Sequence, residues 1–88
     1  RGFAFVVASD VSADALVRAA RAAERALTSR IPVFDVYSGK GIEPGHKSLA
    51  LAVTLQPVDK TLTEAEIEAI SGKIVAQVVK ATGATLRR

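Results

Sequence analysis

The sequence predicts an α+β sandwich in which four antiparallel strands form one sheet and two helices cover one of its faces. Apolar residues recur at every second position in several short stretches, which is the period of a strand. In two longer stretches they recur at every third or fourth position, which is the period of a helix. Along the chain the stretches follow the order strand, helix, strand, strand, helix, strand.

The length of 88 residues predicts a single domain over residues 1 to 88. Arg1 stands directly before the first strand, which indicates a fragment of a longer chain. No apolar run reaches the ~18 residues that a membrane span requires, and no signal-peptide pattern opens the chain. We therefore expect no membrane partner and a cytoplasmic location.

Composition excludes several kinds of site. The chain contains no cysteine and one histidine, so disulfides, thiolate metal sites and iron–sulfur clusters are excluded, and a single imidazole cannot form a metal site alone. We expect no cofactor or metal in this domain. Twelve basic and nine acidic side chains give a net charge of +3, which permits a polyanionic partner without requiring one.

The first strand is expected over residues 2 to 8, where bulky and small residues alternate. The bulky set should face the core and consists of Phe3, Phe5 and Val7. Asp10 and Ser12 end this strand and offer a cap for the following helix, which is expected over residues 13 to 28. One side of this helix should be buried by Leu16, Ala20, Ala23 and Leu27. Its other side is interpreted as a solvated face that carries Arg18, Arg21 and Arg25.

The middle of the chain is predicted to form a hairpin with one apolar and one open face. Strict alternation in its first strand places Phe34 and Val36 toward the core, and Val33, Asp35 and Tyr37 on the open face. The loop is expected over residues 38 to 47, and the next strand over 48 to 55. That strand has a core set of Leu49, Leu51, Val53 and Leu55 and a small set of Ser48, Ala50, Ala52 and Thr54. The loop glycines do not follow a strand-to-helix turn, so no nucleotide-binding fingerprint applies.

The second helix is expected to begin after Thr63, because Thr63 and Glu66 have the spacing of a capping box. Its buried stripe should comprise Ile67, Ile70, Ile74, Val75, Val78 and Val79. Gly83 can supply the left-handed cap that ends it. Residues 84 to 88 should form a short last strand, with Leu86 facing inward and Arg87 on the open face.

This order of elements, with two right-handed crossovers, is that of the ferredoxin-like βαββαβ sandwich. Both helices then lie on one face of the sheet, and the other face is open. An open sheet that carries an aromatic ring among hydrogen-bonding groups is typical of single-stranded RNA binding, where bases stack and their edges are read. From the residues alone a structural interpretation stays open, in which the loop half-buries Tyr37 and Ser48 merely starts a strand.

Four motifs carry a family resemblance: Phe34-Asp35-Val36-Tyr37, Gly41-Ile42, Lys47-Ser48-Leu49-Ala50 and Thr61-Leu62-Thr63. At this spacing they resemble the ferredoxin-fold anticodon-binding domain that closes the β chain of bacterial phenylalanine–tRNA ligase (phenylalanyl-tRNA synthetase). The resemblance covers essentially the whole chain. One departure is Gly2, which stands where most relatives have an acidic residue, so we expect no contact there.

The resemblance implies that the open sheet face binds the anticodon stem-loop of a phenylalanine-accepting tRNA. The contact positions that it implies are Asp35, Tyr37, Ser48 and Arg87, with Arg88 as the alternative if the register is off by one. Lys40 and Lys47, at the loop, are expected to join the RNA-binding set. The resemblance further implies a parent ligase that uses ATP and magnesium at a distant site, with the rest of the β chain and the α chain as partners.

Two other classes of function compete with RNA binding. Acylphosphatases share this shape but need an asparagine beside a phosphate-binding loop, and the chain has no asparagine. Asp35 has no obvious acidic neighbour or burial to tune it, so we expect no catalysis from the domain itself. The remaining alternative is a small-molecule-sensing or dimerisation domain, in which a symmetric interface would hide the open face.

Overall fold

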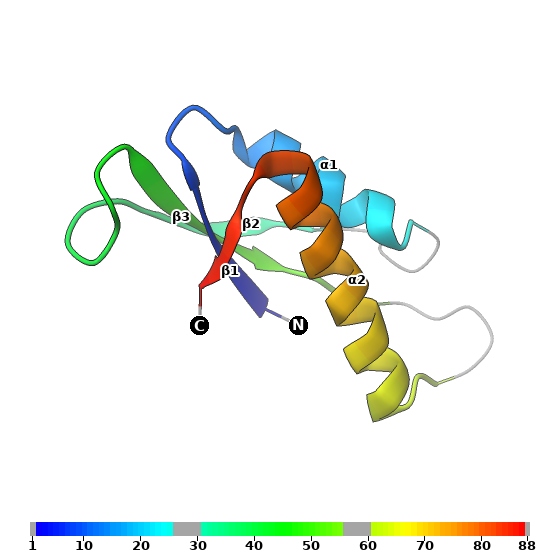
Figure 1. The fold of residues 1–88 in the computed structure, drawn as a ribbon. Coiled ribbons are helices and arrows are strands. Elements are labelled where there is room, and N and C mark those ends of the chain that lie inside the picture. The colour runs from blue at the N-terminus through cyan, green and yellow to red at the C-terminus, as the bar shows by residue number, and fades with distance from the viewer. Residues whose placement is uncertain (1, 26–30, 56–60, 88) are drawn as a thin grey trace.

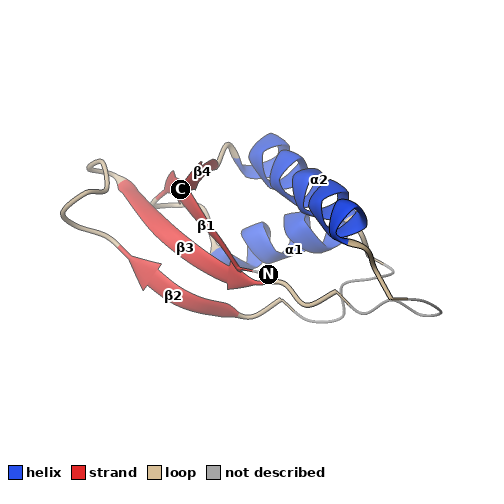
Figure 2. Cartoon of the chain, turned by 90° about the horizontal axis from the view of Figure 1, so that it is seen from below, coloured by secondary structure: helices blue, strands red, loops and turns tan. Residues whose placement is uncertain are grey.

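The computed structural model describes residues 2–25, 31–55 and 61–87. Its elements are β1 (Gly2–Ala8), α1 (Ala13–Ala23), β2 (Val33–Tyr37), β3 (His46–Ala52), α2 (Glu64–Thr82) and β4 (Thr85–Arg87). Both helices lie on the same face of the sheet (Figures 1 and 2). The predicted ferredoxin-like sandwich is confirmed. Neither helix of the described ranges is both long and apolar enough to cross a bilayer.

The sheet has the strand order β2-β3-β1-β4, and every neighbouring pair is antiparallel. β1 and β3 pair along their whole length, from Gly2 opposite Ala52 to Ala8 opposite His46. This pairing extends β3 by two residues at its start, so the hairpin loop covers 38–45 rather than 38–47. The predicted end of β3 at residue 55 was also wrong, because regular pairing stops at Ala52.

The core lies between the sheet and the two helices, and alternation predicted most of it. Its largest fully buried side chains are Phe5, Val7, Leu16, Leu49, Leu51, Val53, Ile74 and Val78. Burial of one such aliphatic or aromatic side chain stabilises a fold by roughly 1.5–3 kcal/mol. The helix side of the sheet therefore supplies the buried core, and the opposite face does not contribute to it.

Helix α1 begins as predicted and ends earlier than predicted. The Ser12 hydroxyl accepts a hydrogen bond from the Ala15 N–H at 3.0 Å. The helix ends at Ala23 instead of residue 28, and Lys73 of α2 contacts the carboxylate of the C-cap residue Glu24 at 3.3 Å. No glycine or proline marks this end, and helix propensity does not include such tertiary contacts. Leu27, a predicted core residue, lies outside the described ranges.

The predicted solvated arginine face of α1 is confirmed only in part. Arg18 and Arg25 are exposed, and Arg18 pairs with Asp14 at 3.1 Å. Arg21 is half-buried, and its Nε is enclosed with no hydrogen-bond partner among the residues that the structure describes. The reason is its position one turn after Val17, a residue that packs against the core. Arg21 thus lies at the edge of the buried stripe rather than opposite it.

A β-bulge in β2 changes which side chains of that strand face the core. The register passes from Val33 opposite Leu51 to Asp35 opposite Ala50, so β2 has one residue more than β3 here. Val33 consequently packs against the core, whereas uninterrupted alternation placed it beside Asp35. Val36 is on the helix side but is 60% exposed, because β2 is an edge strand. The predicted inward side chain of residue 34 lies outside what the structure describes.

Helix α2 has both predicted caps. The Thr63 hydroxyl accepts a hydrogen bond from the Glu66 N–H at 3.1 Å, and the Thr63 N–H donates to the Glu66 carboxylate at 2.9 Å, which completes the capping box. At the other end Gly83 has a φ of 73°, and its N–H donates to the Val79 carbonyl at 2.9 Å. Both ends of this long helix are therefore fixed by local contacts.

One predicted core residue of α2 lies at the surface. Ile70, Ile74 and Val78 are buried, but Val79 is 41% exposed. Val79 follows Val75 by one helical turn, on the side of α2 that borders the three-residue strand β4. So short a strand leaves this side of the helix partly uncovered.

The capping box yields a test of the fold. Thr63→Ala should lower the free energy of unfolding by about 1 kcal/mol, because it removes a hydroxyl that satisfies a backbone N–H of the first turn. The control Thr61→Ala makes the same chemical change at an exposed position outside the helix and should cost less than about 0.5 kcal/mol. Urea denaturation of both variants measures the difference, and equal costs would contradict the cap.

Candidate functional site

The open face of the sheet carries side chains from all four strands in two adjacent rows. The register gives a first row of Tyr37, Ser48, Val6 and Thr85 and a second row of Asp35, Ala50, Ala4 and Arg87. Directly opposed residues of antiparallel strands point to the same face. The predicted placement of Asp35, Tyr37, Ser48 and Arg87 on one face is thereby confirmed.

Small residues form the floor between the functional side chains. Ala4 and Ala50 occupy the two central strands of the second row, so nothing large stands between Asp35 on one edge strand and Arg87 on the other. Neighbouring strands are about 4.8 Å apart, which separates those two backbones by roughly 14 Å. The floor is wide enough for a flat ligand group.

Tyr37 is positioned by the hairpin loop that follows it. Its hydroxyl donates a hydrogen bond to the Lys40 carbonyl oxygen at 2.6 Å. Gly39, between them, has a φ of 122°, a backbone conformation that favours glycine. The side chain of Tyr37 nevertheless remains 38% exposed. The loop therefore holds the hydroxyl end of the ring without enclosing it, so the structural interpretation of Tyr37 accounts for only part of its environment.

Arg87 reaches from β4 across the two central strands toward Tyr37. Its Nη1 lies 3.5 Å from the Ser48 Oγ, at the outer limit of hydrogen-bond length. Its Cζ lies 5.9 Å from the centroid of the Tyr37 ring, within cation–π range. Ser48 is only 4% exposed although it belongs to the open face. The three side chains thus form one contiguous group that draws on three strands.

The structure separates the two lysines assigned to the site. Lys40 is exposed in the loop next to Tyr37. Lys47 lies opposite Val7, whose side chain is buried under the helices, so alternation directs Lys47 to the helix side of the sheet. The sequence predicts Lys47 in the loop, where its side chain could point to either face of the sheet. This prediction is wrong, because β3 begins at His46 and includes Lys47. Arg88 lies outside the described ranges.

Two features of the site escaped sequence reasoning. The contact between Arg87 and Tyr37 joins residues fifty positions apart on opposite edge strands, so no local pattern indicates it. The role of Gly39 as the turn that lets the loop carbonyl meet the Tyr37 hydroxyl could have been inferred from a glycine two residues after a strand-end tyrosine. Both features concern how the ring is held.

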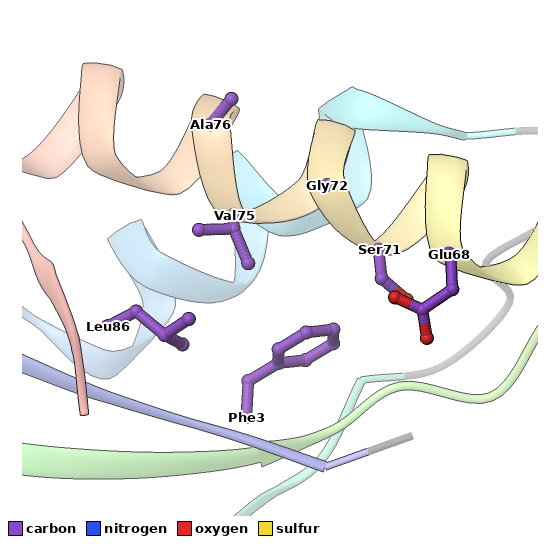
Figure 3. Close-up of a pocket in the computed structure, with 7 residues that line it drawn as sticks. All are labelled: Phe3, Glu68, Ser71, Gly72, Val75, Ala76 and Leu86. Atoms are coloured by element: carbon purple, nitrogen blue, oxygen red, sulfur yellow. The ribbon is translucent and has the colours of Figure 1, made fainter. Parts of the chain in front are cut away.

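A pocket lies on the helix side of the sheet, opposite the open face (Figure 3). It separates α2 from β1 and β4, has a volume of about 360 Å³, and is lined by Phe3, Glu68, Ser71, Gly72, Val75, Ala76 and Leu86. Its lining is mostly apolar and includes no histidine. Across the described ranges, no group of three metal-binding side chains occurs. Among the described residues, the group that brings a phenol, a hydroxyl and a guanidinium together is the one on the open face.

A family model described as the ferredoxin-fold anticodon binding domain matches residues 1–87. The chain belongs to this family. It is 55% identical to the phenylalanine–tRNA ligase beta subunits of Bradyrhizobium diazoefficiens and Rhodospirillum rubrum, and 58% identical to that of Paramagnetospirillum magneticum. Each match covers 99% of this chain and 11% of the relative. The motif resemblance to a ferredoxin-fold anticodon-binding domain is confirmed.

The turn below Tyr37 yields a paired prediction on glycine. Gly39→Ala should destabilise the domain by about 1 kcal/mol or more, because alanine is strained at this positive φ. Gly72→Ala, inside α2 with no atom within 4 Å of the new Cβ, should instead stabilise it by roughly 0.5–1 kcal/mol. Chemical denaturation compares the two variants. A stabilising Gly39→Ala would show that the turn has another conformation.

Proposed function

We propose that the open sheet face of this domain binds the anticodon stem-loop of a tRNA. The observation that carries the proposal is the convergence of Tyr37, Ser48 and Arg87 with Asp35 on one uncovered face of an anticodon-binding family member. In a longer chain the domain would serve as the anticodon-recognition module of a phenylalanine–tRNA ligase β subunit, acting on phenylalanine-accepting tRNA.

Tyr37 supplies the main stacking surface in this proposal. Stacking of one base on an aromatic side chain contributes ~1–3 kcal/mol. The ring is suited to this task because its hydroxyl is hydrogen-bonded to the loop, which restricts rotation of the side chain. A ring held in advance loses less conformational entropy when a base stacks on it.

Polar groups around the ring supply base discrimination and phosphate contact. The carboxylate of Asp35 is acceptor-only, so it pairs with amino and imino donors on a base edge. The Ser48 hydroxyl both donates and accepts. Arg87 and the loop residue Lys40 bring positive charge to the two margins of the face, where a backbone that enters and leaves the site would pass. The net charge of +3 is consistent with this arrangement.

The domain has no catalytic task in this proposal. Asp35 is exposed on the open face and is in none of the ion pairs between described residues, whereas a general base is commonly buried or paired. Aminoacylation would take place in other domains of the parent ligase, which would bind ATP and magnesium there. The rest of the β chain and the α chain would be the protein partners of the domain.

Stacking on Tyr37 is tested by titration of the 88-residue chain with a phenylalanine tRNA anticodon stem-loop. Tyr37→Ala should weaken binding by ~1–3 kcal/mol and leave the circular dichroism spectrum unchanged, because the ring lies on the face away from the helices. The control is Val36→Ala, which removes an exposed apolar side chain from the other face of the same strand. Equal affinities for wild type and Tyr37→Ala would refute the open-face site.

The loop lysine is tested through the salt dependence of binding. Lys40→Ala should lower affinity for all stem-loop sequences alike and reduce the slope of log K against log salt by about 0.7–0.9, the value for one phosphate contact. Lys47→Ala, with its side chain directed to the helix side, should change the slope less. A larger effect at Lys47 than at Lys40 would place the phosphates on the opposite side of the sheet.

A further inference from the structure

The guanidinium of Arg87 lies over part of the Tyr37 ring surface that a stacking base would use, although the ring remains 38% exposed. The Arg87 Cζ lies 5.9 Å from the ring centroid, and its Nη1 lies 3.5 Å from the Ser48 hydroxyl oxygen. A guanidinium is planar and stacks on aromatic faces, as a base does. The arginine therefore lies over the ring surface that a base would use, at the outer limit of cation–π range.

We propose that Arg87 is a placeholder, which lies over part of the Tyr37 ring and against Ser48 in the free domain and moves aside when a base stacks on the ring. This inference rests on the proposed function and adds a conformational step to it. The step exchanges a cation–π contact with Arg87 for a stacked base. After the exchange the guanidinium is free to pair with a phosphate, for which its donor geometry is well suited.

The placeholder is explained by what the open face exposes. The Tyr37 ring and the nearly buried Ser48 lie on the face of the sheet opposite α1 and α2 (Figure 2). A flexible arginine from the edge strand can shield both while its charge stays hydrated, as long cationic side chains commonly do. The alanine floor beneath its path, formed by Ala4 and Ala50, offers no side chain that would lock the arginine in one position.

The displacement should cost little. An exposed cation–π contact corresponds to a factor of about two to five in an equilibrium constant. A hydrogen bond at 3.5 Å adds little to it. Arg87 thus competes weakly with a base for the ring, and it contributes attraction when that base carries a phosphate backbone. These two effects have opposite signs, so they can be measured separately.

The RNA-free arm of the test uses tyrosine fluorescence. The chain has one tyrosine and no tryptophan, so its emission reports on Tyr37 alone. Acrylamide, a neutral quencher, should reach the ring more readily in Arg87→Ala, with a rise in the quenching constant of less than about threefold, because the ring is already 38% exposed. The matched control Arg18→Ala, at an arginine of α1 that is 72% exposed and paired with Asp14, should equal wild type. Circular dichroism checks that each variant is folded.

The ligand arm compares a neutral probe with a charged one. Adenosine, which stacks but has no phosphate, should bind Arg87→Ala about two- to fivefold more tightly than wild type. The anticodon stem-loop should bind the same variant more weakly, because a phosphate partner is lost. Both results together support the placeholder.

Two outcomes would overturn it. Unchanged quenching in folded Arg87→Ala would mean that the arginine does not cover the ring in solution. Weaker adenosine binding by Arg87→Ala would mean that the arginine assists stacking instead of competing with it. Neither outcome decides the proposed function, which is read from stem-loop binding by wild type and Tyr37→Ala.

Discussion

The antiparallel pairing of β1 with β3 is the constraint on which the rest of the structure depends. Its register sets Phe5 opposite Leu49 on the helix side and Ala4 opposite Ala50 on the open side. Because side chains alternate strictly along a strand, a slip of one residue would turn the bulky set outward and the small set inward. Burial of the bulky set under two helices makes such a slip costly. The two edge strands then attach to a central pair whose faces are already assigned.

The site combines a rigid centre with side chains that come from the margins. Tyr37 and Arg87 belong to the two edge strands and meet above the central pair, next to Ser48. The ring is held by a loop carbonyl, whereas the contacts of Arg87 with the described side chains of Tyr37 and Ser48 are weak. A binding surface of this kind has one fixed component and one that can adapt. The fixed component favours stacking, and the adaptable one favours contact with a backbone whose path varies.

Much of this arrangement could be predicted from the sequence, and the exceptions have physical causes. Regular alternation located the core face, and cap spacing located Thr63 and Gly83. The bulge in β2 places Val33 on the face of the sheet opposite to the predicted one, because an alternating pattern does not reveal an extra residue in a strand. The early start of β3 moved Lys47 from a loop to the helix side. The contact of Arg87 with Tyr37 depends on the packing of distant strands, which no local pattern encodes.

The alanine floor of the open face has a consequence for how such a domain changes over generations. Ala4 and Ala50 are partly exposed and pack against no helix, so larger residues there would meet little steric resistance. Larger side chains at these positions would change the stability of the fold little, but they would alter the shape of the surface that a ligand contacts. Mutations that alter ligand recognition therefore lie mainly on the open face, and mutations that alter stability lie mainly on the helix side. Recognition can then change in evolution without a prior increase in the stability of the domain.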